Sequence, residues 1–114
     1  MAIASTFGKN SMATHYGTIA AYGAVYTSAP GASAGTEPSG GSPAYARKAL
    51  TWSSASGGVL SASATFDVPA GTTVVGTGVH DAVTAGNYID GKTETSVNFP
   101  TQDTVTVTFT FTET

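Results

Sequence analysis

The chain has 114 residues, which is room for one domain of ordinary size and not for a second. Thr, Ser, Ala and Gly fill more than half of it, and charged residues make up 10%, less than half of their share in an average soluble domain. This composition excludes a coiled coil or a long surface helix, and the net charge of -3 argues against a nucleic-acid binder. The chain has no cysteine, which excludes disulfides and thiolate metal sites.

No targeting or membrane segment is predicted. Residues 1–10 lack a basic region followed by an apolar run, and no apolar stretch approaches the ~20 residues that span a bilayer. We therefore expect no membrane partner. Large aliphatic side chains other than Val are confined to Ile3, Ile19, Leu50, Leu60 and Ile89. The core is therefore lean, and partners are expected to cover part of a surface that carries so little charge.

The N-terminal residues 1–18 are predicted to form a short helix or an extended arm. Ser5 or Thr6 is placed to cap a helix that runs from Ser5 to Tyr16, and Gly17 is placed to end it. Both alternatives stay open at this point, because glycines weaken the helical pattern.

A first strand and a long loop follow. Residues 19–27 alternate in the manner of a strand. Residues 28–43 are rich in Ser, Ala, Gly and Pro, contain one charged residue, Glu37, and show no periodicity. They predict a long surface loop, and we interpret it as a contact arm, because loops of this length are often functional.

Six further strands are predicted from apolar–polar alternation between turn residues. They cover residues 45–53, 60–66, 73–81, 87–93, 96–99 and 104–112. Gly76 and Gly78 share one face of their strand and indicate a bulge or close packing by a neighbour. The alternation is clearest in residues 104–112, where Val and Phe face inward and Thr faces outward.

The strand pattern predicts an all-β fold: a single-domain, jelly-roll-like β-sandwich of about seven strands over residues 1–114. The last strand is long and uncharged, and such a strand invites pairing when its edge is free. We therefore expect it to lie centrally in a sheet or to be covered by a partner.

Three patterns that suggest a site have simpler structural explanations. Gly86–Thr93 matches the phosphate-binding pattern G-x-x-x-x-G-K-[ST], but a strand-like segment follows it instead of the required helix. His80 precedes Asp81, yet no Gly-x-Ser-x-Gly elbow is present for a catalytic triad. The other candidate residues are carboxylates expected at strand ends and turns: Asp67, Asp81, Asp90, Glu94 and Asp103. We therefore expect no catalytic, cofactor-binding or metal-binding residues.

Two further features favour a structural interpretation. The pair Arg47-Lys48 is the only adjacent basic pair, and it is typical of a solvated strand position. Trp52 falls on the same face as Leu50, which favours core packing over a sugar-binding platform.

Four pieces of the chain carry a family resemblance: Val25–Gly31, Gly40–Trp52, Phe66–Thr73 and Gly78–Gly86. They resemble small structural proteins of tailed bacteriophages, chiefly those of actinobacteria, with Gly-Gly-Ser-Pro-Ala-Tyr-Ala-Arg and Val-Pro-Ala-Gly-Thr as the most specific segments. Members are labelled tail-fibre, minor capsid or head-decoration proteins. The resemblance implies a non-enzymatic, self-associating particle component with an all-β fold. His80 departs from the pattern, because relatives have a large apolar or aromatic residue there.

Composition and resemblance together predict a virion protein made in the host bacterial cytoplasm. The favoured function is a minor capsid or head-decoration protein that binds the major capsid protein and stabilises the shell. The alternative is a tail-fibre or tail-tip component that contacts the host surface. A homo-oligomer is expected, with a trimer favoured because closed rings avoid open filaments. A third class, a small hydrolase or sugar-binding enzyme module, predicts loss of activity on replacing His80, Asp81 or Asp90.

Overall fold

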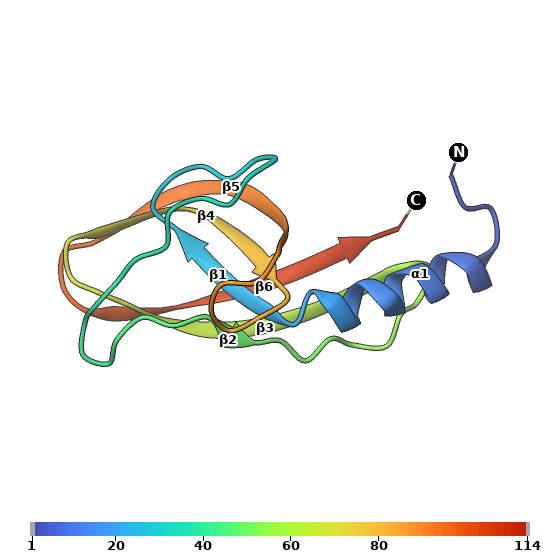
Figure 1. The fold of residues 1–114 in the computed structure, drawn as a ribbon, viewed down its shortest axis with the longest axis horizontal. Helices are drawn as coiled ribbons and strands as arrows, with labels where there is room; N and C mark the ends of the chain where they lie inside the picture. Colours follow the sequence, from blue (N-terminus) through green and yellow to red (C-terminus); the bar gives the residue numbers. More distant parts are fainter. Residues whose placement is uncertain (1, 114) are drawn as a thin grey trace.

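Residues 2–113, which the computed structural model describes, form one helix and six strands in a body of 47 × 23 × 22 Å (Figure 1). The elements in chain order are α1 (Thr6–Ile19), β1 (Tyr22–Tyr26), β2 (Lys48–Ala49), β3 (Val59–Val68), β4 (Thr72–His80), β5 (Tyr88–Phe99) and β6 (Asp103–Thr112). One sheet has the order β2-β1-β4-β5, the other consists of β3 and β6, and every pairing is antiparallel. The predicted all-β sandwich is confirmed.

The N-terminal segment is a helix, which decides between the two alternatives left by the sequence. Ser5 caps it, since its Oγ accepts a hydrogen bond of 3.0 Å from the N–H of Gly8. The helix passes the predicted end at Tyr16 and continues to Ile19, where the N–H of Ala20 still donates to the carbonyl of Tyr16. Gly17 does not end it and lies inside the helix against the Trp52 ring. Figure 1 shows α1 at one end of the sandwich, where it packs on β3.

The core lies between the two sheets. Phe66 and Phe109 meet edge to face with ring centroids 6.3 Å apart, and Val25 and Val68 are buried with them. Gly23 of β1 permits this packing, because a Cβ there would stand 2.9 Å from the ring of Phe109. Trp52 packs against this core, as the sequence predicted.

The β3–β6 ribbon shows the alternation expected from the sequence. It pairs in register from Val59 opposite Thr112 to Val68 opposite Asp103. Inward positions of β6 are Val or Phe, and the outward positions are Thr. On the outer face, hydroxyl groups pair across the strands: Ser63 with Thr108 at 3.0 Å and Thr65 with Thr106 at 2.8 Å. These cross-strand pairs replace the charges of an ordinary solvent-exposed sheet face.

The strand count is six rather than seven, because the predicted strands at 87–93 and 96–99 are one strand, β5. The pairing of β5 with β4 is irregular between Val74 and Gly76. This irregularity interrupts the two-residue alternation of β5, so the sequence pattern shows two short strands instead of one. Sheets of four and two strands are smaller than the eight strands of a full jelly roll, so the prediction holds at the level of the β-sandwich. The close packing predicted at Gly76 and Gly78 is confirmed, since Pro30 and the Tyr26 ring lie against them.

The strand predicted over residues 45–53 is wrong for most of its length, because only β2 remains of it. Arg47 turns away to bind Glu37, and the Trp52 indole donates to the carbonyl of Ala20 at 2.7 Å. The long loop predicted over 28–43 is confirmed, since it contains no strand and only an isolated bridge between Gly41 and Ala44.

Candidate interaction surface

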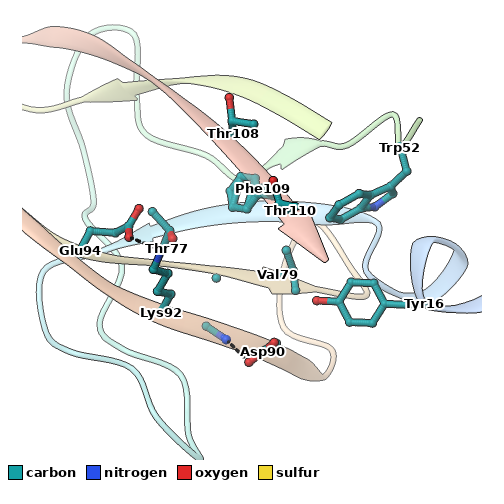
Figure 2. Close-up of a pocket in the computed structure, with 12 residues that line it drawn as sticks. Tyr16, Trp52, Thr77, Val79, Asp90, Lys92, Glu94, Thr108, Phe109 and Thr110 are labelled. Atoms are coloured by element: carbon teal, nitrogen blue, oxygen red, sulfur yellow. Dashed lines mark hydrogen bonds and ion pairs between the residues drawn. The ribbon is translucent and has the colours of Figure 1, made fainter. Parts of the chain in front are cut away.

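The side of the sandwich between β5 and β6 is open, and a groove runs along it (Figure 2). Its wider part has a volume of about 370 Å³, and a second hollow of about 340 Å³ continues toward Phe99 and Val105. The two parts share Thr77, Glu94 and Thr108, so we treat them as one feature, the β5–β6 groove. Its other principal lining residues are Tyr16, Trp52, Asp90, Lys92, Phe109 and Thr110.

The β5 wall of the groove is charged. Asp90, Lys92 and Glu94 occupy every second position of the strand, and Lys92 Nζ lies 3.7 Å from Glu94 Oε1. Asp90 also accepts a hydrogen bond of 2.8 Å from the N–H of Gly91, so it caps a backbone donor of its own strand. Charges directed inward from an edge strand discourage pairing with a foreign strand. The wall contributed by β6 has no charge and presents Thr108, Phe109 and Thr110 (Figure 2).

One end of the groove is aromatic. Tyr16 stacks on Phe111 with ring centroids 3.7 Å apart, and Trp52 meets Tyr16 edge-on at 5.9 Å. Burial raises the pKa of Tyr16 to about 12, and the nearby Asp90 carboxylate adds to the shift. The phenol therefore stays protonated at all physiological pH values, so this end of the groove offers a neutral hydroxyl group on an apolar wall.

The opposite side of the molecule is closed by polar contacts that we call the Glu37–Arg47 network. Arg47 Nη2 lies 2.8 Å from Glu37 Oε2, and Arg47 Nη1 donates to the carbonyls of Ala82 and Ala85 at 2.9 and 2.8 Å. The Tyr45 hydroxyl donates to Glu37 at 2.8 Å. Burial opposes ionisation of Glu37, but the hydrogen bonds from Arg47 and Tyr45 outweigh it and hold the pKa of this carboxyl below its usual value. The network ties the long loop to the turn after β4.

His80 and Asp81 do not form a catalytic pair. His80 is buried, and its Nε2 shares a hydrogen bond of 2.6 Å with the Tyr26 hydroxyl. Burial and the positive charge of Arg47 lower the pKa of His80, so the imidazole is neutral at pH 7. The carboxylate of Asp81 instead accepts from the backbone and side-chain amides of Asn87 at 2.6 and 2.8 Å. Both residues stabilise the fold.

The remaining candidates are scattered over the sheet. Gly86–Thr93 leads into β5, which pairs with β4, so a strand stands where a phosphate-binding loop needs a helix. Asp67, Asp81 and Asp103 lie at strand ends or turns as predicted. Asp90 and Glu94 do not, because both lie inside β5 and line the groove.

The sequence did not single out the Glu37–Arg47 network. The sequence predicts a solvated strand position for Arg47, and this prediction is wrong, because its side chain is only 11% exposed. One signal was present: Glu37 is the single charge of the long loop, and Arg47 is the only arginine of the chain.

Polar groups of the described region are used within the fold. Every buried side-chain nitrogen and oxygen among residues 2–113 has a hydrogen-bond partner. The same residues hold no group of three or more His, Asp or Glu side chains arranged as metal ligands, and no helix in them is long and apolar enough to cross a membrane. The β5–β6 groove combines a charged wall, an uncharged wall and an aromatic end on an open side of the sandwich, which makes it a candidate for contacts with other molecules.

Comparison with known families identifies the kind of protein. The model of the family described as podophage GP4 fiber I protein gp80 matches residues 4–112. The chain belongs to this gp80 family. The match includes α1 and all six strands, and no curated protein and no solved structure matches the chain. The resemblance inferred from the sequence is thus right for a phage structural protein, and the gp80 family carries the name of a fibre protein rather than that of a capsid protein.

Proposed function

We propose that the chain is a non-enzymatic tail-fibre or tail-tip component of a phage virion, made in the host cytoplasm and built into the particle. The observation that supports this proposal is the gp80 family match over residues 4–112, since that family is named for a fibre protein. It favours the alternative derived from the sequence over the minor capsid or head-decoration function.

Physical properties of the chain support a building block. Its body is about twice as long as it is wide, at 47 × 23 × 22 Å, and only 10% of its residues are charged. Low charge reduces repulsion between copies that pack closely in a particle. Threonine and serine lose little rotamer freedom on burial, so contacts between such surfaces form at a low entropic cost.

Fractionation of virions tests the proposal. Tails are sheared from purified particles, heads and tails are separated, and the chain is quantified in each fraction by mass spectrometry. A fibre component leaves with the tails in few copies. A decoration protein that binds the major capsid protein stays on DNA-filled heads in hundreds of copies, and that result would overturn the fibre assignment.

We also propose that copies of the chain associate with one another. The trimer favoured by the sequence uses a closed threefold ring, which avoids open filaments. The free edge of β6 offers a twofold arrangement as well, and the experiment in the next subsection separates the two.

A further inference from the structure

One edge of β6 is unshared. Within residues 2–113, β6 pairs only with β3. The N–H of Glu113 donates to the carbonyl of Gly58 on the β3 side, at 2.8 Å. Backbone groups alternate between the two sides of a strand, so odd-numbered residues face β3 and even-numbered residues face away. The unshared edge therefore carries the backbone N–H and C=O groups of Thr104, Thr106, Thr108, Thr110 and Thr112.

Other edges near the groove are protected, and this one is not. On β5, inward charges and the bond from Gly91 to Asp90 discourage pairing. The outer edge of β3 is partly covered by Ser53, which exchanges hydrogen bonds with Ser61. On the unshared edge of β6, the structure of residues 2–113 shows one such bond, in which the Asp103 carboxylate accepts from the N–H of Thr104 at 2.8 Å. Residues 104–112 contain no charge, Pro or Gly, which is the composition of an edge that recruits another strand.

The free edge is chemically complementary to itself. Residues 104–112 read Thr-Val-Thr-Val-Thr-Phe-Thr-Phe-Thr, a palindrome of residue class about Thr108. When two copies pair antiparallel about this residue, Thr106 lies opposite Thr110, and Val107 lies opposite Phe109. Every hydroxyl then meets a hydroxyl, and every apolar side chain meets an apolar one. The molecule already contains such contacts, in the Ser63–Thr108 and Thr65–Thr106 pairs of its outer face.

We propose that two copies of the chain pair antiparallel through β6, with Thr108 on the twofold axis, and form a continuous four-stranded sheet of order β3-β6-β6-β3. The Val and Phe side chains of the second β6 lie on the same sheet face as those of the first, and that face is the one that borders the β5–β6 groove. The second copy thus covers apolar groove residues such as Val97, which is 48% exposed. This inference does not rest on the fibre assignment, because it concerns the purified chain.

The test uses charges placed on exposed threonines that face each other only in this register. In Thr106→Lys/Thr110→Lys, each new lysine lies opposite a lysine of the other copy. In Thr106→Lys/Thr110→Glu, each lysine lies opposite a glutamate. Within one chain the two positions are about 13 Å apart, too far for an ion pair. Thr93→Lys/Asn98→Lys places the same charges at two exposed β5 residues that do not line the groove, and it serves as the matched control.

The oligomeric state of each variant is measured by sedimentation equilibrium at protein concentrations up to about 1 mM. This range detects dissociation constants in the millimolar range. We expect the wild type and the β5 control to form dimers. The dissociation constant of the Lys/Lys dimer should be at least about 10-fold higher than that of the wild type. The Lys/Glu variant should regain the dimer and lose it again at high salt, because its new pairs are screened. A wild-type monomer at about 1 mM, a trimer that persists in the Lys/Lys variant, or equal dimers in both β6 variants would each overturn the proposal.

A single cysteine gives a second measurement if a charged variant does not fold. The chain has no cysteine of its own, so Thr108→Cys reports only contacts at the axis. Hydrogen-bonded antiparallel partners have Cα atoms about 5.5 Å apart, within the range of a disulfide. Mild oxidation should cross-link Thr108→Cys and leave Thr93→Cys monomeric. Equal cross-linking of both variants, or of neither, would contradict the twofold pair.

Discussion

The two long sides of the sandwich use their polar groups in opposite ways. On the closed side, the Glu37–Arg47 network and the bond between His80 and Tyr26 join the long loop, β1 and the turn after β4. On the open side, β5 and β6 leave a groove whose charged and hydroxyl groups are mostly exposed. The closed side therefore stabilises the single chain, and the groove on the open side is the candidate for contacts with other molecules. Substitutions that test this difference should have very unequal effects.

The largest effect is expected on the closed side. Arg47→Leu removes the ion pair of Glu37, which keeps only the hydrogen bond from Tyr45, and leaves two backbone carbonyls without their donor. We therefore expect the free energy of unfolding to fall by about 2–3 kcal/mol. The matched control is Lys48→Leu, since Lys48 forms a longer, more exposed pair with Asp67 at 3.5 Å and should cost at most about 1 kcal/mol. Urea unfolding measures both, and equal losses would contradict the special role of the network.

Next in size is a steric test of the same side. Gly78→Ala places a methyl group against the ring of Tyr26, so the ring and its bond to His80 must shift. We expect a loss of about 1–3 kcal/mol, the usual cost of overpacking. Gly31→Ala is the control, because a Cβ there meets no atom within 4 Å. Thermal unfolding of the two variants should differ clearly, and a neutral Gly78→Ala would show that this packing is loose.

Acid should weaken the closed side before it affects the open one. The pKa of His80 is held below its ordinary 6.5 by burial and by Arg47, and Glu37 and Asp81 offset this only in part. Between the lowered pKa and 6.5, the unfolded chain binds a proton that the folded chain does not. The contribution of neutral His80 to the free energy of unfolding is therefore fully present above about pH 6.5. It falls as the pH is lowered from there toward the pKa of His80 in the folded chain.

A second loss is expected at lower pH. The folded pKa of Glu37 lies below its ordinary 4.5, so its contribution is complete above that value and is lost as the pH falls through the lowered pKa. Denaturant unfolding from pH 7 down to about pH 2 measures both steps. His80→Gln should flatten the first step, whereas His15→Gln on the exposed helix face should not change it. A first step that survives in His80→Gln would assign it to another group.

The smallest effect is expected in the groove. Lys92 is 79% exposed, and its pair with Glu94 spans 3.7 Å, so Lys92→Ala should change the stability of the single chain by no more than about 0.5 kcal/mol. The same urea measurement applies, at a concentration where the chain is monomeric. A loss above about 1.5 kcal/mol would show that the open side also stabilises the monomer.

Local patterns predicted the elements whose cause is local. Ser5 marks the start of α1 because its side chain bonds to an amide three residues away. The alternation in residues 104–112 predicts β6 and its inward face, because the side-chain period of a strand is fixed by its geometry. The overall sandwich followed from such strands and the turns between them.

Features that depend on distant residues could not be read in this way. Arg47 finds Glu37 ten residues away and Ala82 thirty-five residues away, and no local pattern encodes either contact. The same contacts shorten the strand expected over residues 45–53 to β2. The sequence predicts strand ends or turns for the groove residues Asp90 and Glu94, because the irregular pairing of β5 with β4 interrupts the two-residue period of the strand. That Asp90 and Glu94 line one wall of the β5–β6 groove is known only once the order of the strands in the sheets is known.

The paired hydroxyls on the outer face of β3 and β6 have one more consequence. Serine and threonine neither gain nor lose protons in the range where proteins fold, and dissolved ions do not screen bonds between neutral groups. The face that carries the Ser63–Thr108 and Thr65–Thr106 pairs should therefore present the same chemistry in acidic, neutral, dilute or saline water. This face of the protein would therefore keep its hydrogen-bonding character when the surrounding solution changes.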